Sequence, residues 1–363
     1  MNFVGIKRAK NVRFEPDDIP LEATMASLVP HKSAAGSGLL VIDGPTAGRL
    51  VSVEESIALA EIALRRTSDG TAHQHIRRTL DLQGEAGRCL SLMYGSVAEV
   101  ANFGAKVQSV APLNFKRGLP SHQGGILLFE QEAGRPVALV NASAVTGMRT
   151  PAASAVATRT LSREDACELA LLGYGEQAER HIETIGAIRA LSRVRVWGRD
   201  FTKAKAFAKK NSRGGLHVVA FDTARDAVDG ADIVCTVTSA QFPVLKGEWL
   251  LPGTHVNAVG ASVAALQEID LDCVKRSSIW VDYMPMAMTA ASDIFEPLSK
   301  GIIDRSQVIG EIGSALNGSI RGRSDHREIT IYRSLGVPAQ DIVFANFIFQ
   351  KAVDLGLGTE VSL

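Results

Sequence analysis

Three basic residues stand among apolar or small residues in the first half of the chain, where a solvated charge is out of place. Lys106 lies within Phe103-Gly104-Ala105-Lys106-Val107, Arg149 precedes a small-residue helix, and Arg78 follows Arg77. Interior cations need a partner. A substrate carboxylate is one candidate, because a guanidinium binds a carboxylate through two hydrogen bonds. An ion pair with an internal Asp or Glu is the alternative.

A glycine-rich turn indicates a second kind of chemistry. The apolar run Leu169–Leu172 is followed by Gly173-Tyr174-Gly175-Glu176-Gln177-Ala178, then by a helical segment and the strand-like run Val194–Trp197. Strand, turn, helix and strand in this order form the unit that binds a dinucleotide. The glycines allow a sharp turn and close approach of a pyrophosphate, whose charge the helix N-terminus holds. A tight turn without a ligand is the alternative.

Other strand ends would lie on the same edge of a parallel sheet, where such ligands bind. Arg199 follows the second strand, where an NAD enzyme usually has an acidic residue, and its guanidinium could hold a ribose 2′-phosphate. We therefore expect NADP, while Asp200 keeps NAD open. The loop Thr236-Val237-Thr238 would line the pyrophosphate and the nicotinamide ribose. The segment Val259-Gly260-Ala261-Ser262 would place backbone against the nicotinamide and the Ser262 hydroxyl beside the substrate.

The elements that must position these residues fall into two units. Strand-like and helix-like segments alternate over residues 151–324, which predicts a Rossmann-type parallel sheet of about six strands with helices on both faces. Residues 37–150 are β-rich and include a helix whose predicted capping box begins at Ser52. Residues 325–363 hold a strand-like start and a long helix that ends at Gly356, and we expect this segment to return to the first unit. The predicted fold class is α/β: a doubly wound parallel sheet plus a β-rich α+β domain made from both chain ends, with residues 1–36 as an N-terminal extension.

Composition excludes several classes of protein. The 363 residues are 46% hydrophobic, and 39 basic residues balance 39 acidic ones, which argues against a general nucleic-acid or anionic-membrane binder. The N-terminus lacks the apolar core of a signal peptide, and no apolar run is long enough to span a bilayer. Four widely spaced cysteines fit a reducing cytoplasm, and the histidines show no metal-ligand spacing. We therefore expect a cytoplasmic protein without a metal.

Several longer motifs follow one another along the chain between about Leu39 and Gly358. In chain order they are Phe103-Gly104-Ala105-Lys106-Val107, Gly118-Leu119-Pro120-Ser121-His122-Gln123, Met148-Arg149-Thr150, Leu172-Gly173-Tyr174-Gly175-Glu176-Gln177-Ala178, the segment 252–262 and Gly310-Glu311-Ile312-Gly313. Together they resemble the ornithine cyclodeaminase/mu-crystallin family, and its mu-crystallin-like ketimine reductases in particular.

The resemblance implies a β-rich domain that binds substrate and forms a homodimer, and a central domain that binds the cofactor. It implies that the substrate carboxylate is surrounded by Arg78, Lys106 and Arg149. It also implies that the cofactor contacts include Thr150, Gly173, Gly175, Gln177, Arg199 and the Thr236–Thr238 loop. Ornithine cyclodeaminases carry Asp at this position, whereas this chain has Ser262, like the mu-crystallin-like reductases. A hydroxyl cannot readily replace that carboxylate as acid or base.

We therefore expect an NAD(P)H-dependent reductase of an imine or ketimine carboxylate, or the reverse amino-acid dehydrogenase. Hydride would pass to the imine carbon, and Lys106 or a water held by Ser262 would supply the proton. Two alternatives stay open. One is a lyase that converts ornithine to proline with a tightly bound, recycled NAD, and the other is a protein that binds NADP(H) and a small ligand without catalysis. Asn141-Ala142 replaces the family's usual Asp-Gly, which leaves the substrate's identity open.

Overall fold

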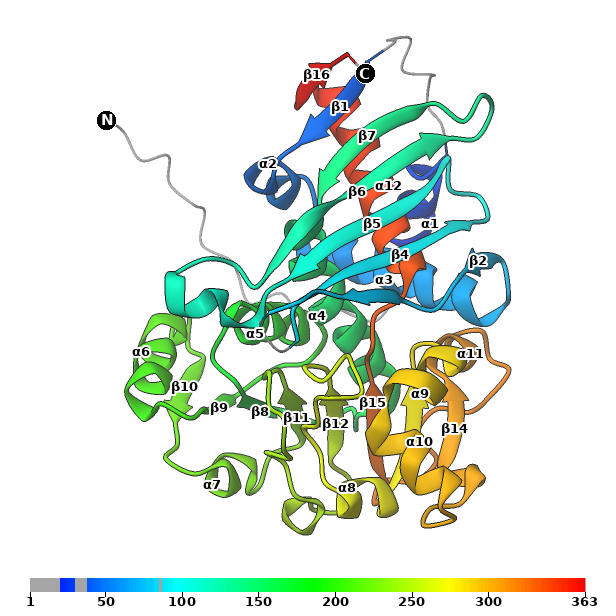
Figure 1. Ribbon diagram of the computed structural model, residues 1–363. Helices are drawn as coiled ribbons and strands as arrows, with labels where there is room; N and C mark the ends of the chain where they lie inside the picture. Colours follow the sequence, from blue (N-terminus) through cyan, green and yellow to red (C-terminus); the bar gives the residue numbers. More distant parts are fainter. Residues whose placement is uncertain (1–19, 30–37, 85–86, 363) are drawn as a thin grey trace.

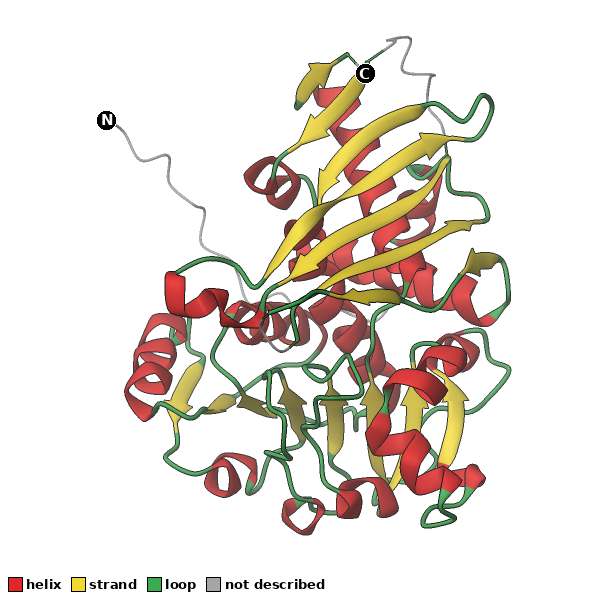
Figure 2. Cartoon of the chain, in the orientation of Figure 1, coloured by secondary structure: helices red, strands yellow, loops and turns green. Residues whose placement is uncertain are grey.

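Two eight-stranded sheets, one above the other in Figure 1, organise the chain. The computed structural model describes residues 20–29, 38–84 and 87–362. The upper sheet, sheet A, is mixed, and every pairing in the lower sheet, sheet B, is parallel (Figure 2). The predicted fold class, a Rossmann-type parallel sheet with a β-rich unit from both chain ends, is confirmed.

Sheet B has the strand order β10-β9-β8-β11-β12-β15-β13-β14. Its strands are β8 (Glu168–Leu172), β9 (Arg193–Trp197), β10 (His217–Ala220), β11 (Ile233–Thr236), β12 (His255–Ala258), β13 (Ser277–Val281), β14 (Val308–Glu311) and β15 (Ile329–Arg333). The six expected strands are present, β14 adds a strand at one edge, and β15 is inserted between β12 and β13. All residues of β15 are buried between β12 and β13, so the chain completes sheet B before it returns to the first unit.

Both faces of sheet B are covered, because side chains alternate across each strand. Leu169 and Leu171 of β8 enter one apolar core, whereas Ala170 and Leu172 enter another on the opposite face. The helical elements of this unit are α5 (Glu176–Ile188), α6 (Phe201–Asn211), α7 (Ala224–Val228), η3 (Gly247–Trp249), α8 (Leu271–Lys275), α9 (Met284–Ala290), α10 (Ser292–Ser299), η4 (Arg305–Gln307) and α11 (Ile312–Leu316), and α4 (Ala142–Leu161) also packs on β12 and β15. Such two-sided burial explains why the strands read as continuous apolar runs.

Sheet A has the order β16-β1-β7-β6-β5-β4-β2, with β3 paired to β4. Its strands are β1 (Leu39–Ile42), β2 (Ala72–Gln74), β3 (Arg78–Asp81), β4 (Cys89–Val97), β5 (Asn102–Val110), β6 (His122–Glu130), β7 (Pro136–Asn141) and β16 (Thr359–Val361). The helical elements of this unit are α1 (Leu21–Ala26), α2 (Gly44–Arg49), α3 (Val53–Ser68), η2 (Pro112–Arg117), α4 (Ala142–Leu161) and α12 (Pro338–Leu355). Antiparallel pairing of β16 with β1 brings the two ends of the chain into one sheet.

Helix α12 runs along the inner face of sheet A, where it shares one apolar core with α3 and α4 (Figure 1). It ends at Gly356 in the left-handed conformation (φ 62°), as predicted. The predicted capping box at Ser52 begins α3. Within the segment expected to be an extension, residues 21–26 form α1 and Leu28 joins the core, while residues 1–19 and 30–36 lie outside the described residues. In the described ranges, no helix has both the length and the apolarity to cross a membrane.

Candidate active site

Lys106 lies on the inner face of sheet A, facing α12. Residues of β5 alternate between buried and exposed, so Lys106 is 2% exposed while Val107 beside it faces outward. The Lys106 Nζ lies 2.9 Å from Oδ1 and 2.8 Å from Oδ2 of Asp341. Burial lowers the pKa of Lys106 to about 8, and the Asp341 carboxylate limits that fall. An internal ion pair thus exists, and a lysine with this pKa can also exchange its proton near neutral pH.

Arg149 approaches the same carboxylate from α4. Its Nε lies 3.8 Å from Oδ1 of Asp341 and has no hydrogen-bond partner among the described residues. The guanidinium packs on Gly336, where an added Cβ would lie 2.4 Å from Nη1 of Arg149. Gly336 has φ +79° and stands two residues before α12 begins, so only glycine suits this position in both space and conformation.

Of the two adjacent arginines, Arg77 faces the sheet B unit and Arg78 faces solvent. Nη1 of Arg77 donates to the carbonyl of Ser262 at 2.9 Å, and Nη2 donates to the carbonyl of Leu335 at 2.7 Å. Arg78 begins β3, whose residues are all exposed. The guanidinium that joins the cluster with Lys106 is therefore that of Arg77, one position before the residue named from the sequence.

His122 lies beside this basic cluster. It begins β6, and its Nδ1 lies 2.9 Å from the Ser121 hydroxyl. His122 is exposed at its edge of the site, and desolvation by the surrounding protein, together with the positive charges of Lys106, Arg77 and Arg149, lowers its pKa. The imidazole is therefore kept neutral beside a group of cations that suits an anionic ligand.

The glycine turn lies at the carboxyl end of β8. Gly173 has φ +131°, and an added Cβ would lie 2.7 Å from the carbonyl oxygen of Val237. Gly175 is the N-cap of α5, and no atom lies within 4 Å of a Cβ placed there. The turn is therefore tight on its inner side and open at the helix N-terminus, as phosphate binding requires.

Where α4 meets the start of α5, several buried polar atoms have no hydrogen-bond partner among the described residues. They are the hydroxyls of Thr146 and Thr150 and Oε1 of Gln177. Contact between the two helices is close, because Nε2 of Gln177 donates to the Thr146 carbonyl at 3.4 Å. Since buried polar groups normally have partners, these atoms fit a site that a dinucleotide phosphate or its waters would complete.

Arg199 follows β9 and is exposed. Beside it, the ring of Tyr174 packs on Gly198, where an added Cβ would lie 2.1 Å from the ring. The Asp200 carboxylate caps α6 by accepting from the Lys203 backbone N–H at 3.1 Å. At this edge the Arg199 guanidinium is therefore exposed to solvent, while the neighbouring Asp200 carboxylate already binds the N-terminus of α6.

The loops after β11 and β12 meet beside this turn. Thr236 and Val259 are buried, and Val237, Thr238 and Ser262 are half-buried. The predicted cofactor loop and the predicted Ser262 are thus brought to one edge of sheet B, while Ser262 also contacts the basic cluster through Arg77.

Sequence reasoning missed two carboxylates that organise these groups, Asp341 and Glu268. Asp341 lies in the first turn of α12, a largely apolar helix, and this was its only sequence signal. Glu268 is 1% exposed and accepts hydrogen bonds from both Thr238 and Gly260. The sequence signal for Glu268 was its place as the only acidic residue in the run Ala264-Ala265-Leu266-Gln267-Glu268-Ile269.

Comparison with known proteins gives one consistent family. The model of the ornithine cyclodeaminase/mu-crystallin family matches residues 45–356. A Delta(1)-pyrroline-2-carboxylate reductase of Bacillus cereus is 33% identical over 326 residues, which cover 89% of this chain and 99% of that protein. The ketimine reductase mu-crystallin of Rattus norvegicus is 30% identical, over 78% of this chain and 86% of its own.

Two solved structures share the whole architecture. The Delta(1)-pyrroline-2-carboxylate reductase of Thermococcus litoralis, in complex with NADH and L-proline, has a TM-score of 0.85 and 31% identity, over 89% of this chain and 100% of its own. An archaeal alanine dehydrogenase dimer with bound NAD has a TM-score of 0.84 and 28% identity, over 89% of this chain and 99% of its own.

Proposed function

Because the chain belongs to the ornithine cyclodeaminase/mu-crystallin family, we propose that it is an NAD(P)H-dependent reductase of a small cyclic imine carboxylate, such as Delta(1)-pyrroline-2-carboxylate. The observation that carries this proposal is the contact of Arg77 with Ser262. It joins the basic cluster of the sheet A unit to the edge of sheet B where the cofactor loops converge. Substrate and nicotinamide would therefore meet at this junction.

In this proposal the substrate carboxylate binds to Arg77, Arg149 and Lys106. The Nε of Arg149 has no hydrogen-bond partner among the described residues, and the Lys106 ammonium has three donors, one of which donates to Oδ1 of Asp341. We expect the Nε and the remaining Lys106 donors to bind the substrate carboxylate. Charge-assisted hydrogen bonds of this kind are about twice as strong as neutral ones. They fix the orientation of the ring, which is the main contribution that a protein makes to hydride transfer.

Reduction adds a hydride to the imine carbon and a proton to the imine nitrogen, which yields the amino acid. A reduced nicotinamide, when bound, supplies the hydride. We assign the proton to the ammonium of Lys106, since its pKa of about 8 leaves it protonated at neutral pH yet able to donate. The Ser262 hydroxyl, through a water, is the second candidate. Asp341 stabilises the ammonium before transfer.

For the cofactor we propose a preference for NADP(H) over NAD(H). The support is the exposed guanidinium of Arg199 after β9, and the engagement of Asp200 as a helix cap. A carboxylate free to bind both ribose hydroxyls, as NAD enzymes usually have, is missing from this position. Thr150, Gln177 and the Thr236–Thr238 loop would contact the phosphates and the nicotinamide ribose, and Val259 would lie against the ring.

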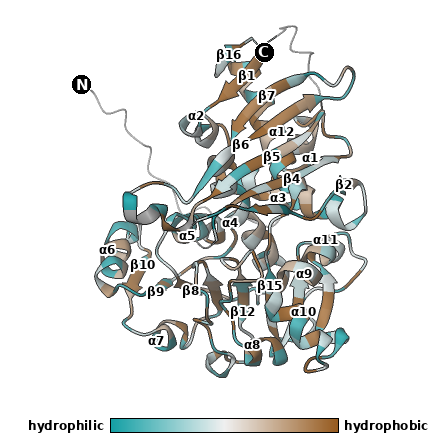
Figure 3. Ribbon diagram, viewed as in Figure 1, coloured by the Kyte–Doolittle hydropathy of each residue, from teal (hydrophilic) through white to brown (hydrophobic). Residues whose placement is uncertain are grey.

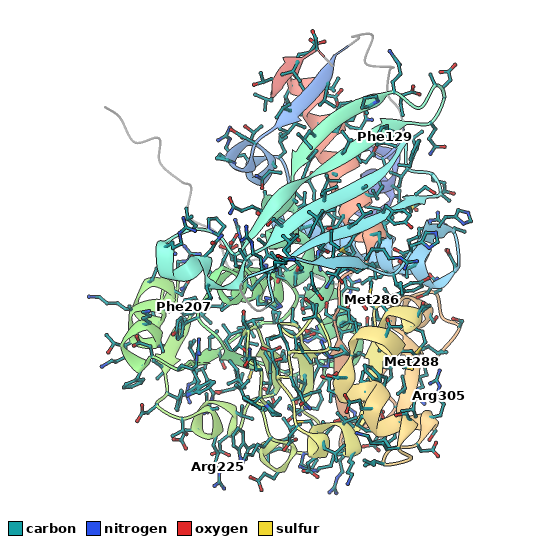
Figure 4. The ribbon with its side chains drawn as sticks, viewed as in Figure 1. Phe129, Phe207, Arg225, Met286, Met288 and Arg305 are labelled. Carbon is teal, nitrogen blue, oxygen red and sulfur yellow. The ribbon has the colours of Figure 1, made fainter. Side chains whose placement is uncertain are left out.

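We also propose that the outer face of sheet A packs against a second copy of the chain. Phe103 and Phe129 stack there with ring centroids 5.6 Å apart, and Figure 4 places Phe129 on this face. They border a hollow of about 840 Å³ that Leu92 and Tyr94 also line. Apolar residues are prominent on these strands in Figure 3, and a relative of known structure is a dimer. An exposed apolar face of this kind is typical of an interface.

The test is to follow NAD(P)H oxidation with five- and six-membered cyclic imine carboxylates, and with pyruvate or glyoxylate plus an amine. We expect oxidation with at least one cyclic imine and formation of the matching amino acid. Ammonia release from ornithine without net oxidation would instead establish the lyase. The Ser262 hydroxyl argues against that outcome, because it cannot act as the carboxylic acid of a deaminase does.

A further inference from the structure

Glu268 is a buried carboxylate beneath the ends of two strands. Its Oε1 accepts from the backbone N–H of Thr238 at 2.6 Å and from the Thr238 hydroxyl at 2.7 Å. Its Oε2 accepts from the Thr236 hydroxyl at 2.9 Å and from the backbone N–H groups of Gly260 at 2.6 Å and Ala261 at 3.2 Å. One side chain therefore binds the loop that follows β11 and the loop that follows β12.

These two loops are in direct backbone contact above the carboxylate. A Cβ at Gly260 would lie 2.0 Å from the carbonyl oxygen of Thr238, so no other residue fits there without displacing backbone. On the other side of the β11 loop, Gly173 makes a similar close approach to Val237. The glycine turn after β8 and the ends of β11 and β12 therefore form one continuous surface, and Glu268 binds two of its three parts.

Arg333 holds the opposite edge of the β12 loop. Its Nη2 donates to the carbonyl of Ala261 and its Nη1 to that of Ala258 at 3.3 Å. Asp293 neutralises this buried arginine through Nε, at 2.9 Å. The β12 loop therefore donates its backbone N–H groups to the Glu268 carboxylate, and its backbone carbonyls accept from the Arg333 guanidinium. The next residue, Ser262, presents its carbonyl to Arg77.

We propose that Glu268 is a positioning residue, which holds the loops after β11 and β12 at the separation that the nicotinamide half of the cofactor needs and thereby sets Ser262 against Arg77. The inference rests on the proposed function, since it assumes that the cofactor binds at this edge. None of the hydrogen bonds of the Glu268 carboxylate to the described residues goes to Ser262 or Arg77. Glu268 would act on the substrate site only through the backbone of Gly260 and Ala261, which lead to Ser262.

The donors around Glu268 favour the ionised form. Each carboxylate oxygen faces at least one backbone N–H, which can only donate. Burial raises the pKa of Glu268, and the hydrogen bonds from Thr238 and Thr236 oppose that rise. A glutamine would fill the same space, but its NH₂ group would face a backbone N–H in either orientation of the amide.

The experiment compares Glu268→Gln with a matched control, Asp270→Asn. Asp270 is a carboxylate two residues away that accepts from the backbone N–H groups of Gly247 and Cys273, both at 2.9 Å, and neither of these donors belongs to the two loops. For each variant we would measure the Kd of NAD(P)H by fluorescence, the KM and kcat with the imine, and the melting temperature. We expect Glu268→Gln to weaken cofactor binding by about tenfold or more and to lower kcat, because a buried donor loses its acceptor. Asp270→Asn should stay within about twofold of the parent in Kd and kcat, even where it costs similar stability.

Equal cofactor binding by Glu268→Gln and the parent would overturn the proposal, as would an equal loss in Asp270→Asn. Where Glu268→Gln does not fold, Thr236→Val serves instead. It removes one of the five hydrogen bonds and keeps the shape, and an unchanged cofactor Kd in that variant would also refute the inference. A parent protein that binds no nicotinamide cofactor would refute the proposed function itself, so the two failures are distinguishable.

Discussion

Replacement of Asp341 by asparagine tests the role of Lys106 through the pH dependence of the reaction. The Asp341 carboxylate raises the pKa of Lys106, whereas burial, Arg149 and Arg77 lower it. When the carboxylate is neutralised only the lowering influences remain, so the pKa of Lys106 must fall below its present value of about 8. Loss of an adjacent opposite charge typically moves a pKa by about one to three pH units.

The sign of the effect follows from the protonation state that the reaction needs. In the proposed mechanism imine reduction requires the Lys106 ammonium, so we expect kcat/KM to decline as the pH rises through the pKa of Lys106. In Asp341→Asn this decline moves to lower pH. A shift of about two pH units leaves about a tenth of the lysine protonated at pH 7, compared with about nine tenths in the parent, and kcat/KM there falls about tenfold.

The assay is the pH profile of kcat/KM for NAD(P)H oxidation by a cyclic imine carboxylate. A matched control is Glu55→Gln, which breaks the more exposed pair between Glu55 and Lys351 at 2.6 Å, another salt bridge to α12. Its profile should match that of the parent. If the alkaline limb of Asp341→Asn stays in place while the rate falls, Lys106 is not the group that titrates.

Three further predictions concern the other parts of the site. Arg77→Met should raise the KM for the imine by about 10- to 150-fold, as expected for loss of charged hydrogen bonds of about 1.5–3 kcal/mol. In the control, Arg78→Met, the KM and kcat should stay within about twofold of the parent values. Similar effects of the two substitutions would refute the assignment to Arg77. Arg199→Ser should reduce the preference for NADPH over NADH by about tenfold or more, measured as the ratio of kcat/KM values, and an unchanged ratio would exclude Arg199 as the 2′-phosphate ligand. Phe103→Asp places a charge on the outer face of sheet A and should convert the dimer to a monomer in sedimentation velocity, since an unpaired charge would be buried in the interface. If the variant remains a dimer, this face lies outside the interface.

The sequence predicts the parallel sheet well, because its strands are buried on both faces and are separated by helical segments. Strands β8 to β13 were expected close to where they lie. β15 was harder to place, since a single apolar strand in a C-terminal segment carries no information about which sheet it joins. Its position between β12 and β13 depends on pairings with residues about 50 to 75 positions away in the chain.

The candidate site was predicted less completely than the fold. Lys106 and Arg149 stood out because their charges are surrounded by apolar or small residues, but the choice between Arg77 and Arg78 depends on how β3 lies at the edge of its sheet. Asp341 is 235 residues from Lys106 in the chain. No local pattern pairs two residues so far apart, and only the packing of α12 on sheet A brings them together.

The most direct test of the central claim is the fate of the transferred hydrogen. Reduced cofactor deuterated at the hydride position would be incubated with the enzyme and a cyclic imine carboxylate, and the product amino acid would be examined by NMR and mass spectrometry. We predict one deuterium on the carbon that bears the carboxylate, with one oxidised cofactor formed for each amino acid. Product without deuterium at that carbon, or turnover that leaves the cofactor reduced, would contradict the account.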